Sequence, residues 1–216
     1  MSSANDKKIV VLGTGGHATV VGDILLLLGY EIYACVGSSP PNSKVFDNCL
    51  YIPTDENLVS ILPNDEVWLV NGLGLLPSTK HIRSKVIEFY ETQGYEFISV
   101  ISPTALISPF SNVEQGAQIL DRAVVHAETR VGKHTIVNTA AIVEHHCVIG
   151  CSVHIAPNST VCGGVKVGDF CHVGAGSVVI QGVEIGSNSL VGAGAVLTKS
   201  IGENSKVYGF KTKIKA

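Results

Sequence analysis

Two adjacent histidines, His145 and His146, follow Glu144 in a stretch, residues 126–172, that contains most of the eight histidines of the chain. An imidazole has an ordinary pKa of about 6.5, so at neutral pH it can accept a proton and release it again, which suits it to general-base catalysis. An outward-facing histidine is nevertheless more often simply solvated. The residue types therefore permit acid–base chemistry at His145. Whether His145 is catalytic depends on the sequence pattern around it.

A glycine-rich turn, Gly13-Thr14-Gly15-Gly16-His17, is the second candidate for chemistry. It lies between an apolar strand predicted at residues 8–12 and a helix predicted to end at Gly29. Such a turn lets the backbone approach a phosphate, whose charge the helix N-terminus stabilises. A nicotinamide site would also need an acidic residue about 20 positions later, where this chain has Val36-Gly37-Ser38-Ser39. The turn therefore favours a nucleotide or nucleotide-sugar phosphate over a redox dinucleotide, with a purely structural turn as the alternative.

The paired histidines lie within a six-residue repeat. From Ile101 to Leu197 every sixth residue is Ile, Val or Leu, which gives seventeen consecutive hexads, and the residue four places later is always compact or β-branched. This period fits short parallel strands that wind around a triangular prism, with three hexads to an 18-residue coil and both of these positions facing inward. Residues 18 apart should then lie side by side in adjacent coils, His154 with His172 and His126 with Glu144. We expect His134 and His172 at the surface.

The chain before the repeat alternates between apolar strands and amphipathic helices. Strands are predicted at residues 8–12, 31–36 and 66–70, and helices before Gly29, at residues 55–62 and before Gly94. This alternation predicts a Rossmann-like βαβαβ unit with a parallel sheet. We expect an α/β domain at residues 1–99, a parallel β-helix at residues 100–203 and a C-terminal tail at residues 204–216.

The composition disfavours several classes of function. The net charge is −3 over 216 residues, so no basic surface indicates binding to nucleic acid or to an anionic membrane. The longest strongly apolar run, Ile24–Leu28, is far too short to cross a bilayer, and the first residues lack the apolar core of a signal peptide. The six cysteines include no CxxC pair, which favours buried free thiols over a zinc or redox site. We expect a cytoplasmic protein.

Both parts of the chain, with the turn at residues 13–17 and the segment from Asn138 to Gly150, resemble one family. This is the bacterial hexapeptide-repeat sugar acetyltransferases, which include sialic-acid O-acetyltransferases and nucleotide-aminosugar N-acetyltransferases. The resemblance implies that the α/β domain binds a nucleotide sugar, and that the β-helix is left-handed, forms a homotrimer and binds acetyl-CoA. No metal is expected: zinc carbonic anhydrases also contain hexapeptide repeats, but their site includes two histidines five residues apart, a spacing absent here.

The same resemblance implies roles for individual residues. His145 is the implied general base, Glu144 and Asn138 line the sugar pocket, and His154 contacts the acetyl thioester. We therefore predict as catalytic His145 and Glu144, as substrate-binding Gly15, Gly16, His17, Gly72 and Asn138, and as acetyl-CoA-binding His154, Gly163, Ala175, Ala193 and Lys213.

Three positions depart from the family pattern. An acidic residue usually follows the catalytic histidine, and here that residue is His146. An acidic pair usually follows the second strand and holds the nucleotide, and here Val36-Gly37 stands there. The tail usually reads Gly-x-Pro-Ala-Lys, of which this chain keeps only Gly209 and Lys213. The identity of the nucleotide therefore stays open, and the role of Lys213 is implied by the last position of the tail motif alone.

The expected reaction is direct transfer of an acetyl group from acetyl-CoA to the amine of a nucleotide-activated aminosugar used for surface glycans. This mechanism requires no cysteine or serine nucleophile. Two other functions stay open: O-acetylation of sialic acid or its nucleotide form, and a non-catalytic scaffold that binds nucleotide or CoA, in which His146 replaces a needed acid. The elaborate first domain disfavours a purely structural β-helix.

Overall fold

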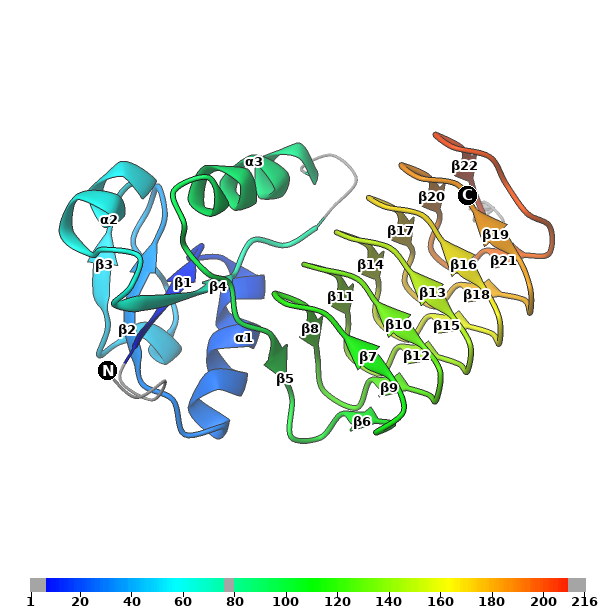
Figure 1. Cartoon of the computed structure of the whole chain (residues 1–216), viewed down its shortest axis with the longest axis horizontal. Coiled ribbons are helices and arrows are strands. Elements are labelled where there is room, and N and C mark those ends of the chain that lie inside the picture. The colour runs from blue at the N-terminus through cyan, green and yellow to red at the C-terminus, as the bar shows by residue number, and fades with distance from the viewer. Residues whose placement is uncertain (1–6, 76–79, 210–216) are drawn as a thin grey trace, which may run out of the picture. The chain divides into compact units, whose positions relative to one another are not determined.

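The computed structural model describes residues 7–75 and 80–209 (Figure 1). The chain divides into two compact units, Met1–Pro103 and Thr104–Ala216, and each contains its own apolar core. No helix within the described ranges is long and apolar enough to cross a membrane.

The first unit is built on a four-stranded parallel sheet with the order β3-β2-β1-β4. Its strands are β1 (Lys8–Leu12), β2 (Ile32–Val36), β3 (Leu50–Ile52) and β4 (Val67–Asn71), and its helices are α1 (Gly16–Leu27), α2 (Asp55–Ile61) and α3 (Lys80–Glu91), with a short 3-10 helix η1 (Lys44–Phe46). Because β1 lies between β2 and β4, the turn that follows it occupies the carboxyl edge of the sheet, where open α/β sheets bind their ligands.

Local chemistry explains the element boundaries in this unit. Helix α1 ends where Gly29 adopts φ +82°, a conformation that costs glycine little. Helix α2 begins after Thr54, whose hydroxyl accepts a hydrogen bond from the Asn57 amide at 3.2 Å. The βαβαβ alternation is confirmed, with one addition. Strand β3 was not expected, because Leu50–Ile52 is too short to show a periodicity of its own, and only its pairing with β2 defines it.

The second unit is the expected left-handed parallel β-helix, made of two-residue strands in three sheets. The seven-stranded sheet contains β5 (Val100–Ile101), β8 (Gln118–Ile119), β11 (Ile136–Val137), β14 (His154–Ile155), β17 (His172–Val173), β20 (Leu190–Val191) and β22 (Lys206–Val207). The six-stranded sheet contains β6 (Leu106–Ile107), β9 (Val124–Val125), β12 (Ile142–Val143), β15 (Thr160–Val161), β18 (Val178–Val179) and β21 (Val196–Leu197). The five-stranded sheet contains β7 (Asn112–Val113), β10 (Arg130–Val131), β13 (Val148–Ile149), β16 (Lys166–Val167) and β19 (Glu184–Ile185).

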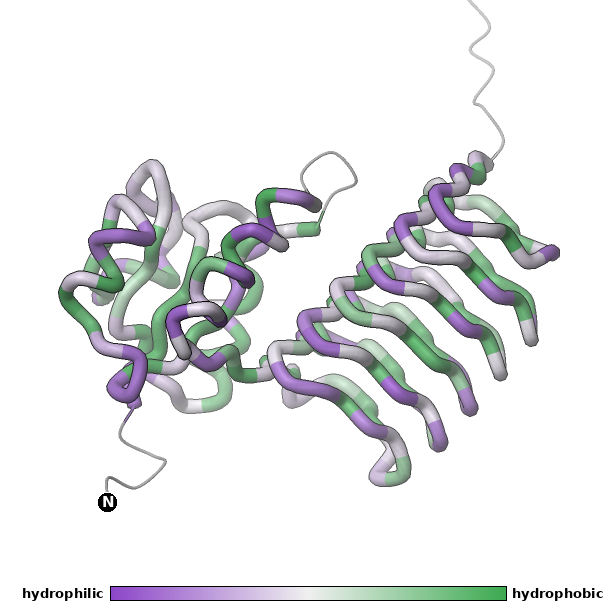
Figure 2. Tube along the Cα trace, turned by 45° about the horizontal axis from the view of Figure 1, so that its top comes forward, coloured by the Kyte–Doolittle hydropathy of each residue, from purple (hydrophilic) through white to green (hydrophobic). Residues whose placement is uncertain are grey.

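Successive coils are offset by 18 residues, as the hexads predict. Ile142 pairs with Thr160 and His154 pairs with His172 in the parallel registers. From Ala105 onward, the apolar residues at the first and fifth hexad positions form one continuous core, and hydrophobic residues recur along every coil in Figure 2. From residue 116 to residue 194 the fourth residue of each hexad turns the corner with a positive φ, and the non-glycine residues at these corners, His146 among them, have φ between 51° and 61°.

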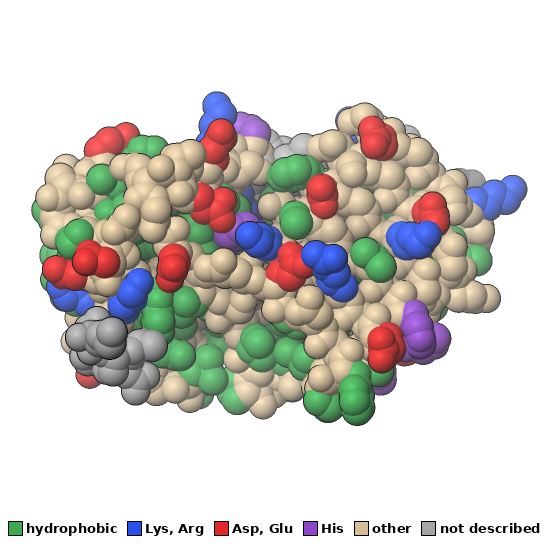
Figure 3. All heavy atoms as spheres, in the orientation of Figure 1, with side chains coloured by type: hydrophobic (Ala, Val, Ile, Leu, Met, Phe, Trp, Pro, Cys, Tyr) green, Lys and Arg blue, Asp and Glu red, His purple; other side chains and the backbone are tan. Residues whose placement is uncertain are grey.

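The outer faces of the β-helix differ in chemistry. On the six-stranded sheet the sixth hexad residues form a nearly continuous apolar row, consisting of Leu106, Val124, Ile142, Thr160, Val178 and Val196. On the five-stranded sheet this position is mostly polar or charged, with Asn112, Arg130, Lys166 and Glu184 beside a single apolar residue, Val148, and Lys166 pairs with Glu184 at 2.7 Å. Side chains of both charges are visible on the molecular face shown in Figure 3. The charged sheet is therefore suited to solvent, and the apolar row is suited to burial.

Candidate active site

The paired histidines lie at the corner between the six-stranded and five-stranded sheets, in the turn that joins β12 to β13. Hydrogen bonds from the neighbouring coils fix their backbone. The amide of His146 donates to the Ala127 carbonyl at 3.1 Å, and the amide of Gly164 donates to the His145 carbonyl at 2.9 Å. The two side chains are exposed, so the fold fixes their main chain and leaves their rings accessible.

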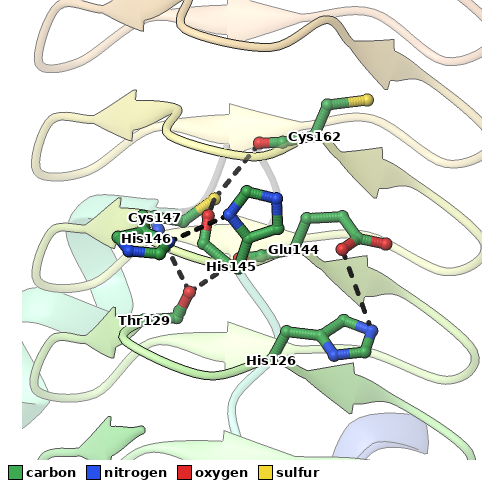
Figure 4. Close-up of polar contacts among 7 residues, drawn as sticks. All are labelled: His126, Thr129, Glu144, His145, His146, Cys147 and Cys162. Carbon is green, nitrogen blue, oxygen red and sulfur yellow. Dashed lines mark hydrogen bonds and ion pairs between the residues drawn. The ribbon is translucent and has the colours of Figure 1, made fainter.

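Thr129, in the preceding coil, forms hydrogen bonds to two backbone groups of this corner (Figure 4). Its buried hydroxyl donates to the Glu144 carbonyl at 2.6 Å and accepts from the Cys147 amide at 3.1 Å. The Cys147 thiol in turn donates to the Cys162 carbonyl at 3.2 Å in the following coil. Polar groups on both sides of residues 144–147 are thus satisfied inside the column, which holds the turn in one conformation.

The His145 ring is in contact on two sides. Its Nδ1 lies 2.9 Å from Nδ1 of His146, and the two rings meet edge to face with centroids 5.1 Å apart. The ring also lies against Gly163, where an added Cβ would stand 2.7 Å from Cε1 and 2.8 Å from Nε2 of His145. Gly163, predicted to contact acetyl-CoA, therefore also leaves the space that the imidazole occupies.

The Glu144 carboxylate points toward His126 in the preceding coil, and its Oε2 lies 3.8 Å from His126 Nε2 (Figure 4). This is the neighbour that the 18-residue offset predicts. Both side chains are partly exposed, so the pair contributes little to stability even when His126 is protonated. Glu144, which is predicted to be catalytic, therefore interacts through its carboxylate with His126, and it precedes His145 directly in the chain.

A second polar cluster lies on the seven-stranded sheet. Asn138, which directly follows β11, places its Nδ2 3.0 Å from Nε2 of His154 in β14. The residue His154 is 7% exposed, and its ring meets the ring of His172 edge to face, with centroids 4.9 Å apart. Two predicted residues, one for the sugar and one for the thioester, are therefore brought together.

The two clusters are separated within one chain. Each coil runs through the seven-stranded, six-stranded and five-stranded sheets in turn. The corner that carries His145 is therefore opposite the sheet that carries His154. Ala175 and Ala193 occupy a third position, the exposed corner after β17 and β20, where the Gly194 amide donates to the Ala175 carbonyl at 2.9 Å. Lys213 lies outside the described residues.

In the first unit, the turn after β1 presents an open helix N-terminus. Gly15 and Gly16 are exposed, and an added Cβ at either would meet no atom within 4 Å. The N-cap of α1 has no side-chain hydrogen bond and its first turn has no acidic residue. His17 is half-buried in the same turn. Nothing in the described packing requires glycine at 15 or 16, so the open surface is available to an anion.

Gly72, by contrast, is needed by the fold. An added Cβ there would lie 2.8 Å from the Ala18 side chain and 2.9 Å from the Leu12 carbonyl oxygen. Its amide also donates to that carbonyl at 2.7 Å. The close approach of the loop after β4 to the turn after β1 therefore explains this glycine without a ligand.

Other reactive side chains in the described part of the chain form neither a metal site nor an activated nucleophile. Within residues 7–75 and 80–209, no three His, Cys, Asp or Glu side chains are placed to hold a metal ion. Burial raises the pKa of the Cys147 thiol above its usual range, which disfavours the reactive thiolate. The expectation of an exposed His134 was wrong, because this side chain is 5% exposed and lies beneath Gly116, and His172 is half-buried.

Comparison with known proteins identifies the family. Residues 8–88 match the PglD N-terminal domain, and residues 146–181 and 164–199 match the bacterial transferase hexapeptide (six repeats). The acetyltransferase domain of PglB from Neisseria gonorrhoeae, solved with acetyl coenzyme A, is 30% identical, with 95% of this chain and 97% of that chain covered and a TM-score of 0.85. The chain belongs to the bacterial hexapeptide-repeat sugar acetyltransferases. These enzymes use acetyl-CoA as the acetyl donor.

Two further structures extend the comparison. A mutant of perosamine N-acetyltransferase from Caulobacter crescentus, solved with CoA and GDP-perosamine, is 28% identical to this acetyltransferase, with 100% of both chains covered and a TM-score of 0.85. WeeI from Acinetobacter baumannii, at 22% identity and a TM-score of 0.74, shares the fold over 94% of this chain and 97% of its own.

Sequence reasoning missed two features of this acetyltransferase. One is the contact between His145 and His146, because the direction of a side chain at a corner with positive φ cannot be read from a repeat. The other is the bridging hydroxyl of Thr129. Its signal was present, since Thr129 and Thr135 are the threonines among the small residues at the fifth hexad position, and Thr135 makes the same pair of hydrogen bonds one corner later.

Proposed function

We propose that this acetyltransferase transfers the acetyl group of acetyl-CoA to the amine of a nucleotide-linked aminosugar, with His145 as the general base. One observation carries the proposal. The exposed His145 imidazole is held in a defined orientation, by His146 at Nδ1 and by the backbone of Gly163 against the ring. A base contributes to the rate only when it is positioned toward the proton that it removes.

In the proposed reaction the sugar amine attacks the carbonyl carbon of the thioester, and a C–N bond forms. Nε2 of His145 accepts the proton that the amine loses. The tetrahedral intermediate then collapses with cleavage of the C–S bond, and the proton passes from His145 to the sulfur of CoA. No covalent acetyl-enzyme is needed, in keeping with the Cys147 thiol, whose pKa is raised by burial and which donates to the Cys162 carbonyl.

The turn at residues 13–17 is the proposed site for the phosphates of the nucleotide sugar. Gly15 and Gly16 leave the start of α1 open, and a helix N-terminus favours negative charge. The GDP-perosamine present in the Caulobacter crescentus structure supports a nucleotide-linked acceptor. Val36-Gly37 stands at the end of β2 without an acidic pair, so the nucleotide itself is not assigned.

A homotrimer with shared active sites is part of the proposal. The corner that carries His145 and the sheet that carries Asn138 and His154 lie on opposite sides of one column, so a single copy would not bring them to one substrate. The apolar row on the six-stranded sheet offers surface for a second copy, and Val196 is 61% exposed in the single chain. We place the reaction in the cytoplasm, where acetyl-CoA and nucleotide sugars are both available.

The decisive experiment replaces His145 with alanine. Turnover should fall by about 10²-fold or more, while the dissociation constants of both substrates stay nearly unchanged. Structures of two histidine mutants of the perosamine enzyme contain both CoA and GDP-perosamine, which supports the second expectation. His81→Ala, which removes an exposed histidine from α3, is the control. Near-wild-type turnover of His145→Ala would overturn the general-base role.

A further inference from the structure

His146 stands where an acidic residue is usual in this family, and it contacts His145 directly. The two Nδ1 atoms are 2.9 Å apart, within hydrogen-bonding distance. Two unprotonated nitrogens would repel each other, and two N–H groups would clash, so this contact holds one proton. One ring donates and the other accepts, and the two possible arrangements differ in chemistry.

Only one arrangement is compatible with catalysis by His145. If His146 donates, the proton of neutral His145 is on Nε2, and the atom that should accept a proton from substrate is blocked. If His145 donates from Nδ1, its Nε2 carries a free lone pair. When His145 then becomes an imidazolium, it has protons on both nitrogens, and a bare Nδ1 of His146 can still accept. The arrangement in which His146 accepts therefore persists through the reaction.

We infer that His146 is a positioning residue that accepts a hydrogen bond from Nδ1–H of His145, fixes the tautomer with a free Nε2, and stabilises the imidazolium as a neutral acceptor. This inference rests on the proposed base role of His145. The substrate proton goes to Nε2, the Nδ1 proton stays between the two rings, and the same Nε2 proton later goes to the CoA sulfur. An imidazole thus takes over the orienting role of a carboxylate.

Two of the titratable side chains near His145 are directed to other partners. The titratable side chains on the neighbouring turns are Glu128, His126, Glu144, Cys147 and Cys162. The Glu144 carboxylate is directed to His126, and the Cys147 thiol is directed to the Cys162 carbonyl. The backbone of His146 is fixed by its bond to Ala127 and by φ 59°, a conformation in which histidine is one of the better tolerated residues.

Two substitutions of His146 distinguish the effect of its hydrogen-bond acceptor from the effect of its ring. His146→Phe keeps a flat ring and removes the nitrogen, and Phe170 shows that phenylalanine is accommodated at the fourth hexad position of another corner with φ 57°. His146→Asn supplies an acceptor oxygen, and Asn158 and Asn188 occupy equivalent corners with φ 55° and 61°. Thermal unfolding of both variants should match that of the wild type, because neither changes a buried group.

The kinetic test compares kcat with KM. We expect His146→Phe to lower kcat at least about tenfold, the loss expected for a hydrogen bond to a charged group, with KM for both substrates unchanged. His146→Asn should retain clearly more turnover, and His146→Asp at least as much as His146→Asn. Equal losses in His146→Phe and His146→Asn, or an unaffected His146→Phe, would overturn the inference.

Nitrogen NMR provides a readout that a structural role would not move. In protein labelled with ¹⁵N-histidine, His145 should show a protonated Nδ1 and an unprotonated Nε2, with the signals assigned by their loss in His145→Ala. In His146→Phe this pattern should shift toward protonated Nε2, and in His146→Asn it should stay. A wild-type His145 protonated on Nε2 would refute the role of His146. If instead His145→Ala keeps its turnover, the general-base role of His145 is itself wrong. The two experiments therefore distinguish a failure of the role of His146 from a failure of the role of His145.

Discussion

Replacing Gly163 with alanine tests whether the position of the His145 ring controls turnover. A Cβ at residue 163 would lie 2.7 Å from Cε1 and 2.8 Å from Nε2 of the imidazole. Ordinary carbon contacts begin near 3.5 Å, so the ring must move by about 0.7–0.8 Å. A displacement of about 1 Å at a reacting group can cost about 10²-fold in rate, so we expect kcat to fall between about tenfold and 10²-fold.

The assay follows the free thiol of CoA that is released with each turnover, over a range of both substrates. Gly202→Ala is the matched control, because its added Cβ meets no atom within 4 Å and its φ is not positive. It should leave kcat unchanged. A wild-type kcat for Gly163→Ala would refute the reasoning. A rise in KM for acetyl-CoA with an unchanged kcat would do the same, and would leave Gly163 as a contact to acetyl-CoA alone.

Three further predictions follow from other parts of the molecule. Gly16→Val should weaken nucleotide-sugar binding about tenfold or more, as expected for one lost hydrogen bond to a phosphate, and leave acetyl-CoA affinity unchanged by calorimetry; equal loss of both ligands would indicate misfolding instead. Cys147→Ala should keep turnover within about threefold at a stability cost of about 1 kcal/mol in thermal unfolding, whereas loss of all turnover in a folded protein would contradict direct transfer. Light scattering should give the mass of a trimer at micromolar concentration, and a monomer would remove the shared active sites.

The β-helix could be predicted in detail because one physical constraint repeats without interruption. Each hexad must place an aliphatic side chain at its first position and a compact or β-branched one at its fifth, or the core does not close. The 18-residue offset then follows, and with it the pairs His154 with His172 and Glu144 with His126. Contacts between adjacent coils could thus be predicted from the 18-residue offset alone.

The α/β unit was predictable only at the level of its longer elements. Helix α1 and strand β1 carry enough apolar residues to show their period, and Gly29 marks the end of the helix. Strand β3 has three residues and is defined only by its partner β2. The burial of His134 was missed for a related reason, because the space beneath Gly116 exists only once the coils are stacked.

The repeat also determines where this enzyme can vary its chemistry. The first and fifth hexad positions are filled by the core, so a substitution there disturbs packing. Glu144, His145 and His146 occupy the second, third and fourth positions, whose side chains leave the column at a corner. Their backbone is held by Thr129 and by hydrogen bonds from both adjacent coils, independently of what the side chains are. A carboxylate can therefore be exchanged for an imidazole at residue 146 at little cost to the fold, and the consequence should be confined to the proton on His145.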